Sequence, residues 1–168
     1  ERKYFMKSRK IVADSSSDVL SLKFTPYSAA PLKIIAGERE FTDDVKIDVK
    51  EMVDYLDTYK GKSSTSCPNC SDWTNAFGQA DEIFCITITG TLSGSFNAAV
   101  MAKHSYEEEH PDRKVYVMNS LTAGPEIALI IEKLEELVNS DLTFEEICKQ
   151  INEYKENTAL LFMLSSMK

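Results

Sequence analysis

Two kinds of chemically useful residue lie together in "KSSTSCPNCSDW", residues 62–73. Cys67 and Cys70 have the Cys-x-x-Cys spacing, which is typical of a dithiol redox centre or of half a zinc site. A run of hydroxyl side chains, residues 63–66, stands directly before them. Hydroxyls together with free backbone N–H groups at a helix start can bind an anion. The stretch therefore supports two competing interpretations, a thiol site and an anion-binding site.

The thiol interpretation is weakened by the neighbouring elements. In the thioredoxin-like arrangement a Cys-x-x-Cys motif follows a strand directly and opens the next helix, whereas the element predicted before Cys67 and Cys70 is a helix over 48–59. His104 and His110 have a spacing seen in zinc ligands. However, the segment between Cys70 and His104 is expected to hold a helix, a strand and most of another helix. That gap is too long for a zinc finger, so no metal site is predicted.

Hydroxyl-rich turns follow three predicted strands, and a fourth hydroxyl-rich segment precedes a helix. These are "DSSSD" (14–18), "TGTLSGS" (89–95), "NSLTAG" (119–124) and the expected loop "SSTS" (63–66). In doubly wound sheets, ligands bind outside the carboxyl ends of the strands, where such turns meet. Each turn taken alone has the composition of an ordinary helix N-cap. Together, with Ser93, Gly94 and Ser95 letting the backbone approach closely, they predict a site for an anionic or polar head group.

The edge of the sheet where these turns meet, called the rim below, lacks the usual parts of a catalytic site. It has no Lys, Arg or His, and Asp14 is the one carboxylate placed to act as a base or nucleophile. A phosphatase of the Asp-x-Asp type would need a second Asp at position 16, where the chain has Ser16. Hydroxyls and amides can hold a carboxylate at about 1.5–3 kcal/mol per charged hydrogen bond, but they transfer no group. Binding is therefore favoured, while a hydrolase using Asp14, a dithiol oxidoreductase and a regulatory domain with an empty rim stay open.

The elements that must position these turns alternate along the chain. Strands are predicted at 10–14, 83–88, 114–119 and 160–164, a hairpin at 31–44, and helices at 48–59, around 73–77, at 93–106, from Pro125 and after Thr143. Asp48 with Glu51, and Thr143 with Glu146, have the capping-box spacing. Apolar strands between amphipathic helices predict one α/β domain, a mostly parallel sheet with helices on both faces.

Composition narrows the choice of partner and compartment. The net charge is −8, from 27 acidic and 19 basic side chains, and no basic cluster stands out, which disfavours nucleic acid and anionic membranes. Residues 1–8 read as a disordered leader. The longest apolar run, 159–164, is far shorter than the roughly 20 residues that span a bilayer. The 4 cysteines are too few for a disulfide framework, so we expect a reducing cytoplasm.

Five segments in order along the chain resemble one known family. They are "IVADSSSD" (11–18), "APLKI" (30–34), "TSCP" (65–68), "TLSGSFNAA" (91–99) and "VMNSLTAGPE" (117–126). Together they resemble the DegV family of bacterial fatty-acid-binding proteins. The closing "LLFMLSSMK" (160–168) is similar to the start of that family's second half. The resemblance implies that residues 9–168 form the family's N-terminal α/β domain and that a second domain, which completes the acyl tunnel, is missing from this chain.

The resemblance also implies a function. It predicts a cytoplasmic carrier, without cofactor and not itself an enzyme, that holds one long-chain fatty acid, contacts membranes only transiently and presents the carboxyl group to a separate ATP-dependent fatty-acid kinase. The family's carboxylate contacts fall on Thr65, Ser66, Ser93, Gly94 and Ser95, with Asp14 and Ser16 close by. Cys67 departs from the family pattern, which usually has Gln at that position. Burying roughly fifteen methylenes at ~0.8 kcal/mol each would let the tail dominate affinity while the rim orients the head.

Overall fold

The computed structural model describes residues 7–161 and 163, and they form two β-sheets. The larger sheet has the order β2-β1-β6-β7 and every neighbouring pair is parallel. Its strands are β1 (Arg9–Asp14), β2 (Tyr27–Ala30), β6 (Glu82–Thr87) and β7 (Lys114–Asn119). The smaller sheet is antiparallel, with β3 (Lys33–Ala36) between β4 (Arg39–Thr42) and β5 (Ser63–Ser66). The predicted α/β fold with a mostly parallel sheet is confirmed.

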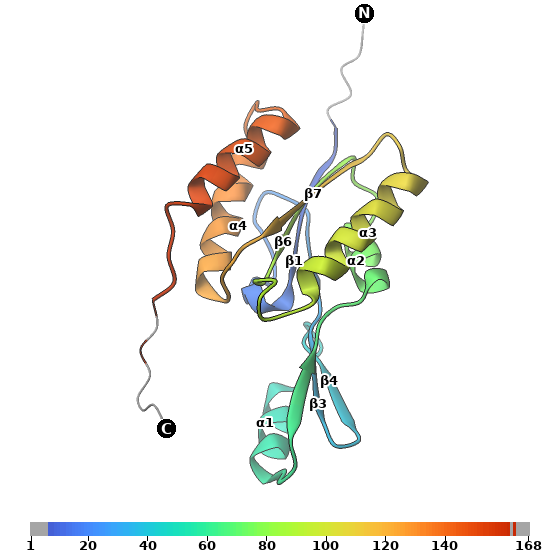
Figure 1. Cartoon of the computed structure of the whole chain (residues 1–168), viewed down its shortest axis with the longest axis vertical. Helices are drawn as coiled ribbons and strands as arrows, with labels where there is room; N and C mark the ends of the chain where they lie inside the picture. Colours follow the sequence, from blue (N-terminus) through green and yellow to red (C-terminus); the bar gives the residue numbers. More distant parts are fainter. Residues whose placement is uncertain (1–6, 162, 164–168) are drawn as a thin grey trace, which may run out of the picture.

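Helices cover both faces of the parallel sheet (Figure 1). On one face lie α2 (Cys70–Phe77) and α3 (Ser95–Glu109), and on the other lie α4 (Pro125–Val138) and α5 (Phe144–Lys155). The central strand β6 is buried along its whole length, and its side chains alternate between the two hydrophobic cores. Ile83 packs in the core with α2 and α3, whereas Phe84 packs in the core with α4 and α5. A continuous apolar strand therefore suits a sheet covered on both sides.

Helix starts follow local side-chain chemistry. Thr143 accepts a hydrogen bond from the backbone N–H of Glu146, whose carboxylate accepts in return, so the capping box predicted for α5 is confirmed. Asp48 accepts from the N–H of Glu51 at the start of α1 (Val49–Thr58). Pro125 occupies the first turn of α4. Backbone N–H groups in the first turn have no acceptor within the helix, so a proline there costs no hydrogen bond.

The antiparallel sheet and α1 form a small lobe beyond the carboxyl edge of the parallel sheet (Figure 1). Its β3–β4 hairpin turns at Gly37, which has a left-handed φ of 63°, and confirms the predicted hairpin. Tyr55 of α1 packs its ring against Phe41 at 5.8 Å between centroids and donates its hydroxyl to the carbonyl of Ala36. The lobe therefore has α1 on one face of a short sheet.

Several predicted boundaries were wrong. Residues 63–66 form the edge strand β5 rather than a loop, and Ser15–Ser17, within the predicted turn after β1, form a 3-10 turn, η1. Strand β2 was not predicted. Leu160, Leu161 and Met163 are not in a strand, and the rest of the predicted closing strand lies outside the described residues. In the predicted leader, Ser8 hydrogen-bonds Asp81 through its N–H and its hydroxyl, and residues 1–6 lie outside the described part.

Within the described residues, no helix combines the length and the apolar character needed to cross a membrane.

Candidate functional site

Four segments meet at the carboxyl edge of the parallel sheet. Strands β1, β6 and β7 are parallel, so they end at the same edge. There the N–H of Ile88 donates to Asp14 Oδ2 at 2.8 Å, and the N–H of Thr89 donates to the carbonyl of Thr122 at 2.9 Å. A Cβ atom built on Gly94 would lie 3.1 Å from Cys67 Sγ, so the segment after β5 touches the start of α3. The predicted hydroxyl-rich turns therefore converge on one rim.

Asp14 is fully buried in this rim, and its carboxylate accepts three hydrogen bonds. Its carboxylate accepts from the hydroxyl of Ser16 at 2.5 Å, the hydroxyl of Ser95 at 2.6 Å and the N–H of Ile88 at 2.8 Å. Burial raises the pKa of Asp14 above its ordinary value, and these hydrogen bonds oppose the rise. A carboxylate held in this way is poorly placed to attack a substrate, which disfavours the hydrolase interpretation.

Some hydroxyl groups of the rim already donate their proton within the protein, whereas others can still donate it to a ligand. A hydroxyl has one proton to donate, and Ser16 and Ser95 donate theirs to Asp14. Ser93 Oγ accepts a hydrogen bond from the N–H of Ser95 at 3.2 Å, so its own proton remains for a ligand. Thr65 is exposed, and its hydroxyl has no partner within the described part of the chain. Of these four predicted residues, Ser93 and Thr65 keep a free donor.

The N-terminus of α3 supplies further donors. Gly94 is its N-cap and provides no side-chain cap, and the N–H groups of Gly94, Phe96 and Asn97 have no acceptor among residues 7–161. The helix is 15 residues long, so its macrodipole places partial positive charge at these groups. Free N–H groups and the dipole together make the helix start an anion-binding position. Phe96 and Asn97 were missed from the sequence because they contribute backbone rather than side-chain donors.

The side chains of Thr65 and Ser66 point to opposite faces of β5. The two residues are consecutive in β5, and successive side chains of a strand point to opposite faces. Thr65 is opposite Ile34 in the register, whereas Ser66 is opposite Lys33. At most one of the two hydroxyls therefore faces the start of α3.

The thiols lie beside this site, although the reason given against a redox centre was wrong. The Cys-x-x-Cys motif does follow a strand directly, because β5 ends at Ser66 and α2 begins at Cys70. Both cysteines are free, but they pack differently: Cys67 Sγ lies toward Gly94, whereas Cys70 packs against the hydrophobic core that α2 and α3 share. This arrangement favours two separate thiols over a dithiol centre.

The histidines do not join the cysteines. His110 follows the end of α3 and packs its ring edge-on against Tyr106 at 4.8 Å between centroids. Among the residues that the structure describes, no three His, Cys, Asp or Glu side chains are grouped so that they could hold a metal ion.

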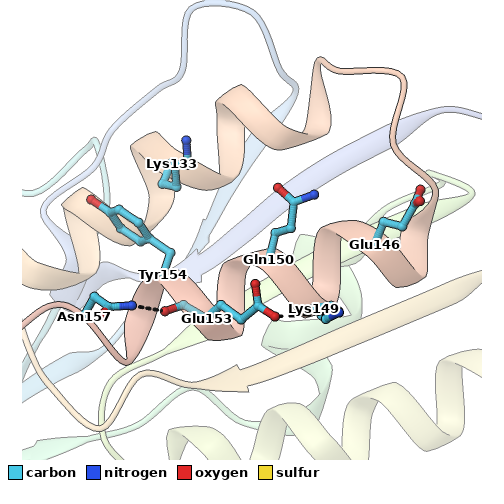
Figure 2. Close-up of a pocket in the computed structure, with 7 residues that line it drawn as sticks. All are labelled: Lys133, Glu146, Lys149, Gln150, Glu153, Tyr154 and Asn157. Carbon is cyan, nitrogen blue, oxygen red and sulfur yellow. Dashed lines mark hydrogen bonds and ion pairs between the residues drawn. The ribbon is translucent and has the colours of Figure 1, made fainter.

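A surface pocket of about 520 Å³ lies elsewhere, between α4 and α5 (Figure 2). Lys133 of α4 lines it together with Glu146, Lys149, Gln150, Glu153, Tyr154 and Asn157 from α5 and the turn after it. Lys149 and Glu153 form an ion pair at 3.8 Å. Side chains of both charges line this pocket, which makes it unsuitable for an acyl chain, so it is not the candidate functional site.

Two exposed leucines flank the rim and were also missed. Leu92, after β6, is 78% exposed, and Leu121, after β7, is 60% exposed. Leu121 has a φ of 58°, a left-handed conformation that is rare for a side chain of this size. In the sequence both residues stand singly among hydroxyls, so no periodic pattern marks them as surface apolar groups.

The chain is similar to proteins of one family. The sequence profile described as "Uncharacterised protein, DegV family" matches residues 8–168. A DegV domain-containing protein of Streptococcus pneumoniae is 41% identical over 162 residues, which cover 94% of this chain and 58% of the relative. The chain thus spans somewhat more than half the length of that relative.

Solved structures show the same similarity. A DegV family protein from Eubacterium eligens, loaded with heptadecanoic acid, is 40% identical with a TM-score of 0.86, covering 89% of this chain and 54% of that one. The Streptococcus pneumoniae Fatty Acid Kinase (Fak) B3 protein, loaded with linoleic acid, gives the same identity, TM-score and coverage. By sequence and by fold, the chain belongs to the DegV family.

Proposed function

We propose that this protein binds a long-chain fatty acid and holds its carboxylate at the N-terminus of α3. The observation that carries the proposal is the set of free donors there, the Ser93 hydroxyl and the N–H groups of Gly94, Phe96 and Asn97. These groups complement a carboxylate in charge and in hydrogen-bonding capacity. Two relatives at 40% identity carry heptadecanoic and linoleic acid, which supports a fatty acid as the ligand.

Thr65 joins these donors in our proposal, while Ser66, Ser95, Ser16 and Asp14 support them. Thr65 is exposed two residues before Cys67, whose thiol lies against Gly94. The hydroxyl protons of Ser95 and Ser16 are already donated to Asp14. The seven residues predicted from the sequence thus divide into direct contacts and residues that shape the rim.

The full-length protein completes the site in this proposal. The chain covers 58% of its Streptococcus pneumoniae relative, and in our proposal a segment that corresponds to the rest of that relative covers the rim and encloses the acyl tail. The exposure of Leu92 and Leu121 beside the donors supports a covering of this kind, because apolar side chains gain free energy when they are removed from water. We place residues 9–168 as the first domain of such a protein.

We further propose that the protein is a cytoplasmic carrier and that a separate ATP-dependent kinase acts on the bound carboxyl group. The name of the Fak B3 relative supports a kinase partner. The burial of Asp14 under three donors supports a carrier rather than an enzyme, since the carboxylate is not free to act as a nucleophile.

The proposal is tested by fatty-acid binding to the protein at its full natural length. Native mass spectrometry should show one bound acyl chain, and oleic acid should displace the fluorescent probe 11-(dansylamino)undecanoic acid. Ser93→Ala removes one charged hydrogen bond, so its dissociation constant should rise about tenfold or more. Ser71→Ala, an exposed serine of α2, is the matched control and should bind like the wild type. Absence of binding by the wild type would refute the proposal.

A further inference from the structure

Asp14 joins the end of β1 to two residues, Ile88 and Ser95, that lie more than seventy positions further along the chain. Its donors are Ser16 in η1, Ile88 immediately after β6, and Ser95, the first residue of α3. Ser95 and Asp14 are both fully buried, and 81 residues separate them along the chain. The position of the α3 start relative to the sheet therefore depends on a hydrogen bond to Asp14.

The connection continues to the proposed donors. The N–H of Ser95 donates to Ser93 Oγ at 3.2 Å, while the hydroxyl of Ser95 donates to Asp14. Fixing Ser95 consequently fixes the hydroxyl of Ser93 and the N–H of Gly94 between them. A small displacement of these groups would misalign hydrogen bonds to a carboxylate, because such bonds weaken steeply with angle.

Direct contact between Asp14 and the ligand is unfavourable. The side chain is fully buried, and its carboxylate already accepts three hydrogen bonds. A second carboxylate beside it would meet a like charge in a poorly solvated place. The raised pKa of Asp14 reflects the same burial.

We infer that Asp14 is a positioning residue: it holds Ser95 and Ile88, and through Ser95 it sets the Ser93–Gly94 donors without touching the ligand. This inference rests on the proposed function and gives Asp14, which the sequence placed close to the carboxylate contacts, a role without ligand contact.

The structure distinguishes two substitutions at this position. In Asp14→Asn the amide oxygen can replace Oδ2 and accept from Ile88 and Ser95, while the amide NH₂ can replace Oδ1 and donate to Ser16 Oγ. All three connections are then kept without the charge. Asp14→Ala keeps none of them and leaves the N–H of Ile88 without its partner.

The binding test uses displacement of 11-(dansylamino)undecanoic acid by oleic acid from the protein at its full natural length. Asp14→Ala and Ser95→Ala should each weaken binding about tenfold or more. The double variant should be no more than about twofold weaker than Asp14→Ala, because both single variants remove the same hydrogen bond between Ser95 and Asp14. Asp14→Asn should restore most of the affinity that Asp14→Ala loses. An Asp14→Asn variant as weak as Asp14→Ala, or additive losses in the double variant, would overturn the inference.

A second measurement needs no ligand. Amide hydrogen exchange at Ser93 and Ala98, whose N–H groups bond the carbonyls of Thr89 and Gly94, should be about tenfold faster in Asp14→Ala and Ser95→Ala, and close to wild type in Asp14→Asn. Exchange at Ile88, which donates to Asp14, should be faster in Asp14→Ala only. Unchanged exchange in Asp14→Ala would overturn the positioning role even if oleic acid binds. A wild-type protein that binds no oleic acid would refute the proposed function, while the exchange rates would still decide whether Asp14 fixes the start of α3.

Discussion

The contact between Cys67 and Gly94 gives a sharp prediction, because it is where the small lobe touches the start of α3. Gly94 has φ −71° and ψ −2°, a conformation that alanine also adopts, so Gly94→Ala adds no backbone strain. The new Cβ would lie 3.1 Å from Cys67 Sγ, several tenths of an ångström closer than a comfortable contact. We therefore expect Gly94→Ala to destabilise the protein by forcing the thiol to move.

The magnitude follows from the packing. Overpacking a core costs about 1–3 kcal/mol, and the half-buried Cys67 can yield, which places the cost near the lower end, about 1 kcal/mol. For a chain of this size that corresponds to a fall in Tm of about 2–4 °C. Alanine is also a poorer N-cap than glycine, by roughly 0.5–1 kcal/mol, but that cost is independent of the thiol.

A double-mutant cycle isolates the contact. Urea unfolding is measured for the wild type, Gly94→Ala, Cys67→Ala and the double variant. Because Cys67→Ala removes Sγ, Gly94→Ala should cost about 1 kcal/mol less in that background than in the wild type. Equal costs in the two backgrounds would show that the segments do not touch, and the convergence of the rim would be refuted.

Three further predictions concern charge and reactivity. Arg9 bonds the buried Glu82 at 3.0 Å, the carbonyl of Val138 at the end of α4 and the carbonyl of Leu142 beyond it. Arg9→Met should therefore lower the free energy of unfolding by about 2 kcal/mol in urea titrations, and a change below about 0.5 kcal/mol would contradict this. Burial raises the pKa of Cys148 to about 12, so its thiol stays protonated at pH 8 and should react with iodoacetamide far more slowly than a free cysteine, as peptide mass spectrometry would show; equal rates would count against the packing. Burial also raises the pKa of Asp14, so the native state takes up a proton there more readily than the unfolded state, and the contribution of Asp14 to stability should fall as pH rises from about 4 through its native pKa. Asp14→Asn lacks this fall, so its Tm relative to wild type should increase from pH 4 to pH 7, and a constant difference would refute the assignment.

Much of the fold could be predicted because its determinants are local. The run "IFCITI" is apolar throughout and so indicates a strand covered on both faces, as β6 is. The spacing of Thr143 and Glu146 is that of a capping box, which by itself predicts where α5 begins. Such patterns need no knowledge of distant partners.

The errors occurred where distant partners decide the structure. "SSTS" has no apolar alternation, and it is a strand because it pairs with Lys33–Ala36 of β3. For the same reason the opposite orientations of Thr65 and Ser66 were not foreseen. Asp14 was expected near the ligand because it follows a strand, but the donors that occupy it come from Ile88 and Ser95, more than seventy residues away.

The central claim is that the start of α3 holds a fatty-acid carboxylate. The most direct test is a crystal structure of the full-length protein with oleic acid bound. We expect one carboxylate oxygen within about 2.7–3.2 Å of the N–H of Gly94 and the other within reach of the Ser93 hydroxyl, with Asp14 still bonded to Ser95. A carboxylate bound away from residues 93–97, or one in direct contact with Asp14, would contradict the account.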